Sequence, residues 1–108
     1  MVTKNLNITY GKASNADPSI YMFRKYGNVV SIFVALKINQ SLNKYDILLT
    51  LPSGCEPTRM IYVNAYNANT HNITLLRLNS SGSLLVDEAM SVASEGSIFL
   101  FVNITYVV

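Results

Sequence analysis

The sequence predicts an all-β fold, an antiparallel jelly-roll or Greek-key β-sandwich or barrel. Short stretches of alternating apolar and polar residues recur along the chain, and Gly, Pro, Asn, Asp and Ser separate them at short spacing. The period of an amphipathic helix does not stand out in any stretch. The 108 residues leave room for one hydrophobic core, and 50% of them are hydrophobic while only 13% are charged. These observations favour a single domain of about eight or nine strands.

The N-terminal part of the chain is predicted to contain one strand and a linker. Leu6–Tyr10 alternates between apolar and polar residues, as a half-buried strand does. Gly11–Ser19 contains Asn, Asp and Pro, which favour turns, so it is predicted to be a turn-rich linker. The expected organisation is an N-terminal strand and linker over residues 1–19, followed by a β-sandwich domain over residues 20–108.

Two long stretches are apolar on both faces of the strands that they predict. Ile20–Tyr26 is predicted to be a strand that turns at Gly27–Asn28 and returns as the strand Val29–Ile38. Both alternating faces of Val29–Ile38 are mostly apolar, and Ser97–Val108 repeats the pattern. The outer faces of a two-layer sandwich of this size should be wet, so the second apolar face needs a cover. Loops are one possible cover. We favour neighbouring copies of the chain in a symmetric homo-oligomer.

The segment Leu51–Pro57, here called the proline corner, contains two prolines and a glycine. Proline lacks a backbone N–H and fixes φ, so this segment fits neither a helix nor a central strand. Predicted strands over Asp46–Leu51 and Arg59–Asn67 flank it, which indicates that the chain crosses between sheets here. Cys55 is the single cysteine, which excludes an internal disulfide, and we expect it to be a small buried filler rather than a reactive thiol.

A short hairpin is predicted in the second half of the chain. Ile73–Asn79 and Ser83–Asp87 have strand character, and two serines and a glycine between them form a good turn. Arg77 and Asp87 are expected to form an ion pair across this hairpin. A weaker strand or irregular connection is predicted for Met90–Gly96.

Composition and residue types argue against several function classes. The net charge is +2 and the basic residues are dispersed, which is unlike a nucleic-acid-binding groove. The apolar runs are too short to span a bilayer, so membrane insertion is not expected. One cysteine, one histidine and scattered carboxylates predict no metal site and no cofactor. Asp87 and Glu88 are adjacent and point to opposite faces of a strand, so they make a poor acid–base pair. An enzyme is therefore not expected.

The strand Arg59–Asn67 offers the best candidate for a recognition face. Tyr62, Asn64 and Tyr66 share one face of this strand, and the polar loop after it contains His71. Tyrosine rings suit the C–H faces of sugars, and amides and an imidazole suit their hydroxyl groups. The alternative is structural: the tyrosines pack at a half-buried subunit boundary, where their hydroxyl groups find partners.

The order of motifs resembles a known domain type. Phe23–Val30 forms a basic strand, a glycine turn and an apolar strand; the proline corner follows, with the pattern LPxGxxP. Leu78–Leu84 then supplies a short SSG hairpin, and the chain closes on an apolar strand that ends near Tyr106. Over residues 20–108 this sequence resembles the C-terminal head domain of receptor-binding and baseplate proteins of tailed phages that infect Gram-positive bacteria, especially lactococcal siphophages.

The resemblance implies a homotrimeric β-barrel or jelly-roll head on the virion, at the tail tip or baseplate and exposed to the host surface. Such heads bind host cell-wall saccharide without cleaving it, often near subunit boundaries, and they attach to other baseplate or tail proteins. One alternative is a structural baseplate or tail-fibre assembly module with no saccharide site. Another is a carbohydrate-binding module of a bacterial hydrolase. The candidate saccharide-binding residues are Tyr62, Asn64, Tyr66, His71, Asn72 and Arg77.

Overall fold

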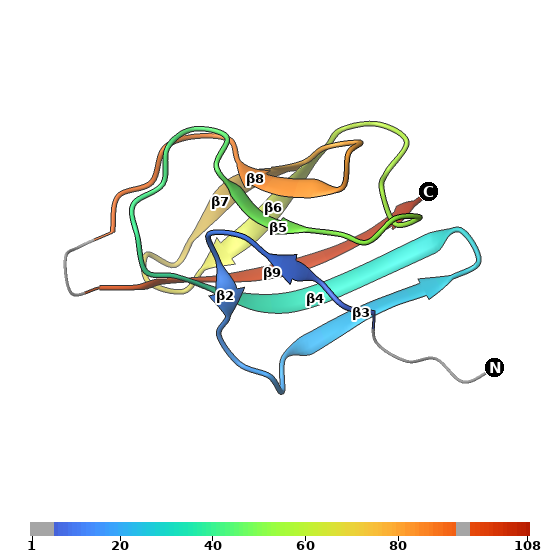
Figure 1. The fold of residues 1–108 in the computed structure, drawn as a ribbon. Coiled ribbons are helices and arrows are strands. Elements are labelled where there is room, and N and C mark those ends of the chain that lie inside the picture. Colours follow the sequence, from blue (N-terminus) through green and yellow to red (C-terminus); the bar gives the residue numbers. More distant parts are fainter. Residues whose placement is uncertain (1–5, 93–95) are drawn as a thin grey trace.

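The computed structural model describes residues 6–92 and 96–108 and shows an all-β fold (Figure 1). The strands pair in antiparallel fashion, which confirms the predicted antiparallel sandwich or barrel. Within these two ranges, no helix is long and apolar enough to cross a membrane. The strands found in the described residues are β1 (Thr9–Tyr10), β2 (Ser14–Asn15), β3 (Tyr21–Tyr26), β4 (Val29–Ile38), β5 (Ile47–Thr50), β6 (Ile61–Asn67), β7 (Asn72–Leu78), β8 (Ser83–Val86) and β9 (Ile98–Val107).

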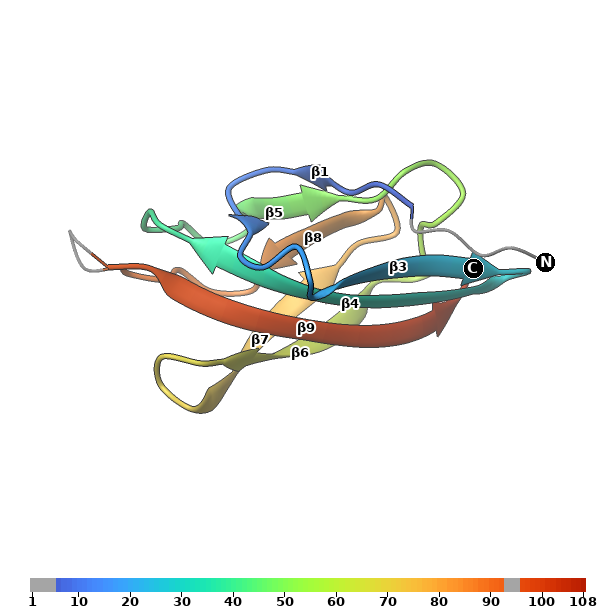
Figure 2. The same cartoon turned by 90° about the horizontal axis from the view of Figure 1, so that it is seen from below.

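The strands form one sheet that curls into a nearly closed barrel with two facing layers (Figures 1 and 2). Neighbouring strands follow the order β1-β5-β8-β7-β6-β9-β4-β2, and β3 pairs with β4 on the same side as β2. In Figure 2, β3, β4 and β9 make up one layer and β1, β5 and β8 lie over it. The hairpin of β6 and β7 crosses obliquely from one layer toward the other, and its loop extends away from the body.

The N-terminal segment closes the barrel, and here the structure differs from the linker predicted over Gly11–Ser19. β1 pairs with β5, β2 pairs with β4, and the residues between them run along the edge of β5. The Gly11 N–H donates to the Leu48 carbonyl (2.8 Å) and the Lys12 N–H to the Ile47 carbonyl (3.0 Å). A Cβ atom on Gly11 would lie 2.6 Å from the Ile47 carbonyl oxygen, so this close approach requires glycine. β2 is too short to produce an alternating pattern, which is why the sequence did not reveal it.

The core lies between the two layers and is built from one face of each long strand. β4 has the predicted bounds, and its even-numbered side chains are all buried, together with Phe23 from β3. The opposite face of β4 and β9 is only partly covered. Ala35 is buried there, but Phe33 and Phe99 remain 38% and 37% exposed. Coverage of these rings by other copies of the chain stays a prediction.

The proline corner joins β5 to β6 and is hydrogen-bonded to the β7–β8 turn and to the last strand, β9. The Leu51 N–H donates to the Gly82 carbonyl (2.9 Å), and the Cys55 N–H donates to the Pro52 carbonyl (3.2 Å). The Tyr106 hydroxyl donates to the Cys55 carbonyl (2.6 Å). The Cys55 side chain is buried, as predicted, and burial raises the pKa of its thiol. Such a thiol stays protonated, and the side chain contributes to the packing of the core.

The connections in the second half of the chain are mostly as expected. The predicted hairpin joins β7 to β8, and the Asn79 N–H donates to the Ser83 carbonyl (2.9 Å). The predicted connection Met90–Gly96 begins with a two-way backbone bridge between Met90 and Leu42 (2.8 and 2.9 Å). Residues 93–95 of this connection lie outside the described residues.

Candidate functional site

The candidate residues on β6 alternate between solvent and core. Tyr62, Asn64 and Tyr66 are exposed, whereas Val63 and Ala65 between them are buried. This is the period of two that the sequence predicted for this strand. Tyr62 keeps 56% of its surface exposed, so its ring is available to a ligand.

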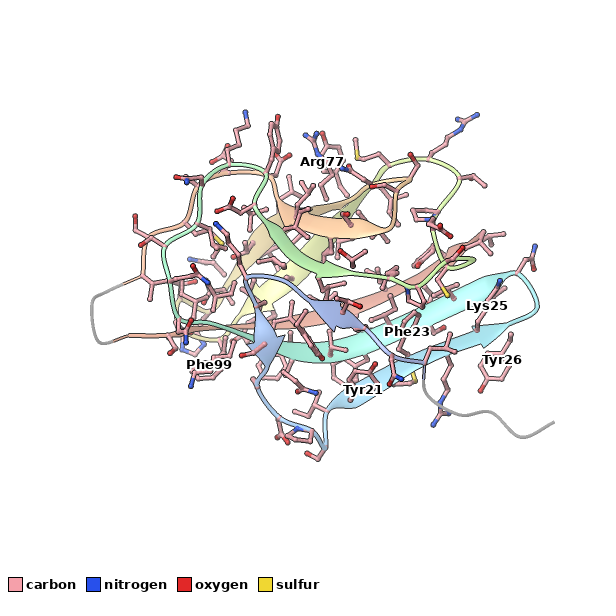
Figure 3. The ribbon with its side chains drawn as sticks, viewed as in Figure 1. Tyr21, Phe23, Lys25, Tyr26, Arg77 and Phe99 are labelled. Atoms are coloured by element: carbon pink, nitrogen blue, oxygen red, sulfur yellow. The ribbon has the colours of Figure 1, made fainter. Side chains whose placement is uncertain are left out.

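Arg77 on β7 lies between two tyrosine rings on the same outer face. Its guanidinium carbon is 5.6 Å from the centroid of Tyr62, its partner in the β6–β7 register, and 5.0 Å from the centroid of Tyr45. Both distances fall within the range of cation–π attraction. Figure 3 shows Arg77 on the upper side of the barrel, above β7 and β8. The two rings are exposed and the Arg77 side chain between them is half-buried; the three side chains are here called the Tyr–Arg–Tyr stack.

The predicted ion pair of Arg77 and Asp87 is confirmed. The Arg77 Nη2 atom donates to Asp87 Oδ1 at 2.6 Å. Desolvation lowers the pKa of the Arg77 guanidinium, but the hydrogen bond and the charge of Asp87 outweigh this effect, so its pKa is raised. The pair also restrains the guanidinium at its place between the two rings.

A second group of candidates lies at the other end of β6. The Tyr66 hydroxyl and His71 Nδ1 share a hydrogen bond of 2.8 Å, and their ring centroids are 6.3 Å apart. Asn72 is exposed at the start of β7, opposite Asn67 in the register. The buried Asn67 side chain accepts the Asn69 N–H through Oδ1 (2.9 Å) and thereby shapes the turn before His71.

The loop that bears His71 is attached to β9 through Asn69. The Asn69 Nδ2 atom donates to the Ser97 carbonyl (2.8 Å), and the Phe99 N–H donates to Asn69 Oδ1 (2.9 Å). The Ala68 N–H donates to the Phe99 carbonyl (2.9 Å). These bonds attach the projecting β6–β7 loop to the start of β9, so the imidazole is presented from an anchored loop.

Two non-glycine residues adopt positive φ angles in the described part of the chain, and both border the candidate face. Tyr45 has φ of 70° and His71 has φ of 60°. The left-handed region costs an L-residue about 1–2 kcal/mol, and such costs often occur at functional sites. Tyr45 is the residue that the sequence analysis missed, because a lone tyrosine in a polar loop carries no periodic signal.

The predicted residues on the outer face gather in two groups rather than one, and the sixth predicted residue, Asn72, does not share that face. Tyr62 and Tyr66 are four positions apart on β6, which corresponds to roughly 13 Å between their Cα atoms. Each group offers a ring for stacking and polar groups for hydrogen bonds. A single sugar ring cannot reach both groups, whereas an oligosaccharide can. The group near the start of β6 contains Tyr62 and Arg77, the group near its end contains Tyr66 and His71, and Asn64 lies between them. Asn72 is opposite Asn67 in the register, so its side chain is on the other face of the sheet from Tyr66.

Aromatic side chains continue from this face onto β9 and β4. Tyr66 is opposite Phe101 in the β6–β9 register, and the two ring centroids are 6.4 Å apart. Phe99 and Phe33 lie on the same outer face of the sheet. Figure 3 shows Phe99 near the end of the barrel where β9 begins, well away from Arg77. The outer face therefore carries tyrosines and polar groups on β6 and β7. Its part on β9 and β4, here called the apolar half, bears three phenylalanines and also the polar residues Ser31, Asn103 and Thr105.

A cleft of about 390 Å³ opens beside the candidate face, along one edge of β7. The six predicted residues do not contribute to its walls. Asp87, the ion-pair partner of Arg77, lines it and thereby connects the cleft to the Tyr–Arg–Tyr stack. The lining residues are Ile73, Thr74, Leu75, Asp87, Glu88, Ala89 and Met90.

The chemistry available on this face is that of hydrogen bonding and stacking. Its side chains are phenols, amides, an imidazole and a guanidinium. Residues 6–92 and 96–108 hold no group of three His, Cys, Asp or Glu side chains that could bind a metal ion. No known protein family and no curated protein matches the sequence. Function is therefore inferred from the geometry of this face and from the order of the sequence motifs.

Proposed function

We propose that this chain is a non-enzymatic adhesion module that binds a saccharide of the bacterial cell surface. The Tyr–Arg–Tyr stack of Tyr45, Arg77 and Tyr62 is the observation that carries the proposal. Its exposed rings suit the C–H faces of sugars, and the guanidinium donates to hydroxyl groups. Asp87 already orders the guanidinium, so a ligand loses less side-chain entropy on binding.

The biological setting follows from the motif order. The resemblance to phage head domains supports a receptor-binding head on the virion, at the tail tip or baseplate, where it contacts the host cell wall. The two groups of candidates on β6, roughly 13 Å apart, favour an oligosaccharide. Single sugar sites on exposed surfaces bind weakly, so several linked heads would supply the practical affinity through effective concentration.

A glycan array that contains cell-wall oligosaccharides of Gram-positive bacteria tests the function. The protein is expected to give a signal for a cell-wall oligosaccharide. Tyr62→Ala and Arg77→Ala should weaken this binding at least about tenfold, or about 1.4 kcal/mol. The matched control is Tyr26→Ala, which removes a comparably exposed tyrosine at the turn between β3 and β4.

The possible outcomes distinguish an error in the proposed function from an error in the proposed binding site. No saccharide signal from folded protein would contradict the adhesion function. A signal that persists unchanged in both Tyr62→Ala and Arg77→Ala would place the site elsewhere on the molecule. Equal losses in these variants and in Tyr26→Ala would indicate a general folding defect, which circular dichroism and the melting temperature of each variant would reveal.

A second candidate function is structural assembly within a baseplate or tail fibre, and the apolar half of the outer face favours it. Phe33, Phe99 and Phe101 lie on neighbouring strands, and the first two keep more than a third of their surface exposed. Exposed aromatic rings on adjacent strands are typical of contact surfaces between subunits. By resemblance to the phage heads, the assembly would be a homotrimer.

Light scattering tests this assembly. An oligomer is expected at micromolar concentration, and Phe99→Glu should shift it toward the monomer mass of 12.0 kDa, because a carboxylate at the contact loses its hydration. Met60→Glu is the control, since Met60 is similarly exposed and lies before the start of β6. A monomer for the unmodified chain would exclude assembly through this face.

A further inference from the structure

The edge of β7 is open over part of its length. β7 pairs with β6 along its whole length. The register runs from Asn72 opposite Asn67 to Leu78 opposite Ile61. On its other side it pairs with β8 only through its last three residues. The first part of β7, including Ile73 and Leu75, therefore has no neighbouring strand on the side of β8. Figure 2 shows the same divergence, because the β6–β7 hairpin swings away from β8 toward its loop.

The chain after β8 turns away from β7 because it pairs with residues 42–46 instead. The Tyr45 N–H donates to the Val86 carbonyl (3.0 Å), and the Val86 N–H donates to the Asp46 carbonyl (3.2 Å). Further on, Met90 and Leu42 exchange two backbone hydrogen bonds (2.8 and 2.9 Å). Residues 86–90 thus pair with residues 42–46 instead of continuing the ladder with β7. The cleft of about 390 Å³ lies between the two.

The backbone of β7 presents unused hydrogen-bonding groups to this cleft. In the β7–β8 hairpin, Asn79 and Ser83 are paired by the hydrogen bond from the Asn79 N–H to the Ser83 carbonyl (2.9 Å). Such pairs recur at every second residue of an antiparallel ladder, so the N–H and C=O groups of Leu75 and Ile73 point to the same side as those of Asn79. No backbone hydrogen bond joins Leu75 or Ile73 to the segment 87–90 in the described part of the chain. An open strand edge of this kind is a template for another strand.

The cleft is lined by acidic side chains and by apolar side chains. Its charged lining residues, Asp87 and Glu88, are both acidic, although the protein as a whole has a net charge of +2. Asp87 is paired with Arg77, so Glu88 leaves the negative charge uncompensated. Ile73 and Leu75 keep 61% and 42% of their surface exposed on the outer face. An occupant with basic and apolar residues in alternation would complement both features.

We propose that the open edge of β7 binds an extended peptide segment of a protein partner, with basic and apolar residues in alternation. The segment adds a short strand between β7 and residues 87–90. Its backbone pairs with Ile73 and Leu75, its apolar side chains cover those two residues, and its basic side chains face Glu88. The open part of β7 spans roughly 10 Å, which corresponds to about three residues of an extended chain. This interaction differs from saccharide binding because its main contacts are backbone groups at the edge of β7, although Ile73 and Leu75 are the register partners of Tyr66 and Asn64.

Two peptide probes test the proposal by ¹H–¹⁵N correlation spectroscopy of the intact chain. The basic probe is acetyl-Val-Lys-Val-Lys-Val-amide, and its acidic counterpart replaces both lysines with glutamate. The basic probe should shift the amide signals of Ile73 and Leu75 and slow their hydrogen exchange, because both N–H groups gain acceptors. It should bind about three- to tenfold more tightly than the acidic probe.

Variants separate the backbone contribution from the charge contribution. Leu75→Pro removes an N–H group that has no acceptor in the ladder and should abolish binding of the basic probe. Glu88→Gln should reduce the preference for the basic probe about three- to fivefold. Thr58→Lys is the matched control, since it changes the net charge by the same +1 at an exposed position before the distant end of β6. It should leave the preference intact.

Several results would overturn the proposal. Equal affinity for both probes, or shifts confined to residues outside the β7 edge, would contradict it. Concentration-dependent shifts of Ile73 and Leu75 without any probe would show that a second copy of this chain occupies the edge. If Leu75→Pro does not fold, Glu88→Gln and the amide map decide the question. Glycan binding should be unchanged in Glu88→Gln, so a failure here is distinct from a failure of saccharide recognition.

Discussion

The Tyr106 hydroxyl donates a hydrogen bond of 2.6 Å to the backbone carbonyl of Cys55, which joins the last strand to the proline corner. The two residues are 51 positions apart in the chain, and both are buried. Burial raises the pKa of Tyr106, so the hydroxyl remains a donor at every ordinary pH. This bond holds the corner at the end of the barrel, and the corner in turn determines where β6 and its outer face begin.

Tyr106→Phe is therefore expected to destabilise the protein by about 1–2 kcal/mol, because it leaves the buried Cys55 carbonyl without this donor. The free energy of unfolding in urea measures the effect. Tyr62→Phe is the matched control, since the Tyr62 ring is exposed, and its stability should change by less than about 0.5 kcal/mol. Equal effects of the two substitutions would show that the corner does not depend on the Tyr106 hydroxyl.

Closure of the barrel depends on the absence of a side chain at Gly11. Gly11→Ala places a Cβ atom 2.6 Å from the Ile47 carbonyl oxygen, and backbone cannot move aside as a flexible side chain would. We expect a loss of about 1–3 kcal/mol in unfolding free energy and faster hydrogen exchange of the Lys12 amide. Ser14→Ala, at an exposed position of the same segment, is the control and should change stability by less than about 0.5 kcal/mol. An unchanged exchange rate would mean that the segment tolerates the methyl group.

These two sites show what the sequence could and could not predict about the fold. β4 and β6 were recognisable because one face of each is consistently apolar and burial enforces that pattern, although β6 begins at Ile61 rather than at the predicted Arg59. The pairing of β1 with β5 and of β2 with β4 was not recognisable. It depends on backbone hydrogen bonds and on one close approach at Gly11, and neither leaves a periodic trace in the sequence.

His71→Gly is expected to raise the stability of the protein while it weakens saccharide binding. His71 has φ of 60°, and glycine avoids the cost of this conformation, which should give a net gain of about 0.5–1 kcal/mol after the extra chain entropy of glycine. The exposed hydrogen bond to Tyr66 is lost, together with the imidazole. The melting temperature and the glycan-array signal measure the two effects. A decrease in both would show that the Tyr66 hydrogen bond stabilises the loop more than the backbone conformation costs.

The candidate site was predictable only where a single strand or a short hairpin determines the geometry. The exposure of Tyr62, Asn64 and Tyr66 follows from the alternation of β6, and the pair of Arg77 with Asp87 follows from the short hairpin. Tyr45 reaches Arg77 because its loop pairs with the end of β8, where the Tyr45 N–H donates to the Val86 carbonyl, and the sequence around Tyr45 does not encode this long-range relationship.

Acid should destabilise the protein through carboxylates whose pKa values folding has lowered. Asp46 accepts the Asn43 N–H (2.8 Å) and the Lys12 ammonium (3.1 Å), and these bonds lower its pKa from the ordinary value of 3.8. The pKa values of Asp17 and Glu56 are lowered by hydrogen bonds as well. A lowered pKa in the folded state means that the unfolded state binds the proton more tightly. The stabilisation is therefore complete above the unfolded pKa values and is lost as the pH falls through the folded ones.

Urea unfolding measured from neutral pH down to about pH 2 should thus show stability that is nearly constant above pH 4.5, the ordinary value for Glu56, and decreases below it. Asp46→Asn should reduce the slope of this decrease, because an amide cannot take up the proton. Asn43→Ala is the paired control. It keeps the carboxylate of Asp46 and the Asn43 backbone N–H, so the slope should remain that of the unmodified chain. A slope unaffected by Asp46→Asn would assign the acid sensitivity to the other carboxylates.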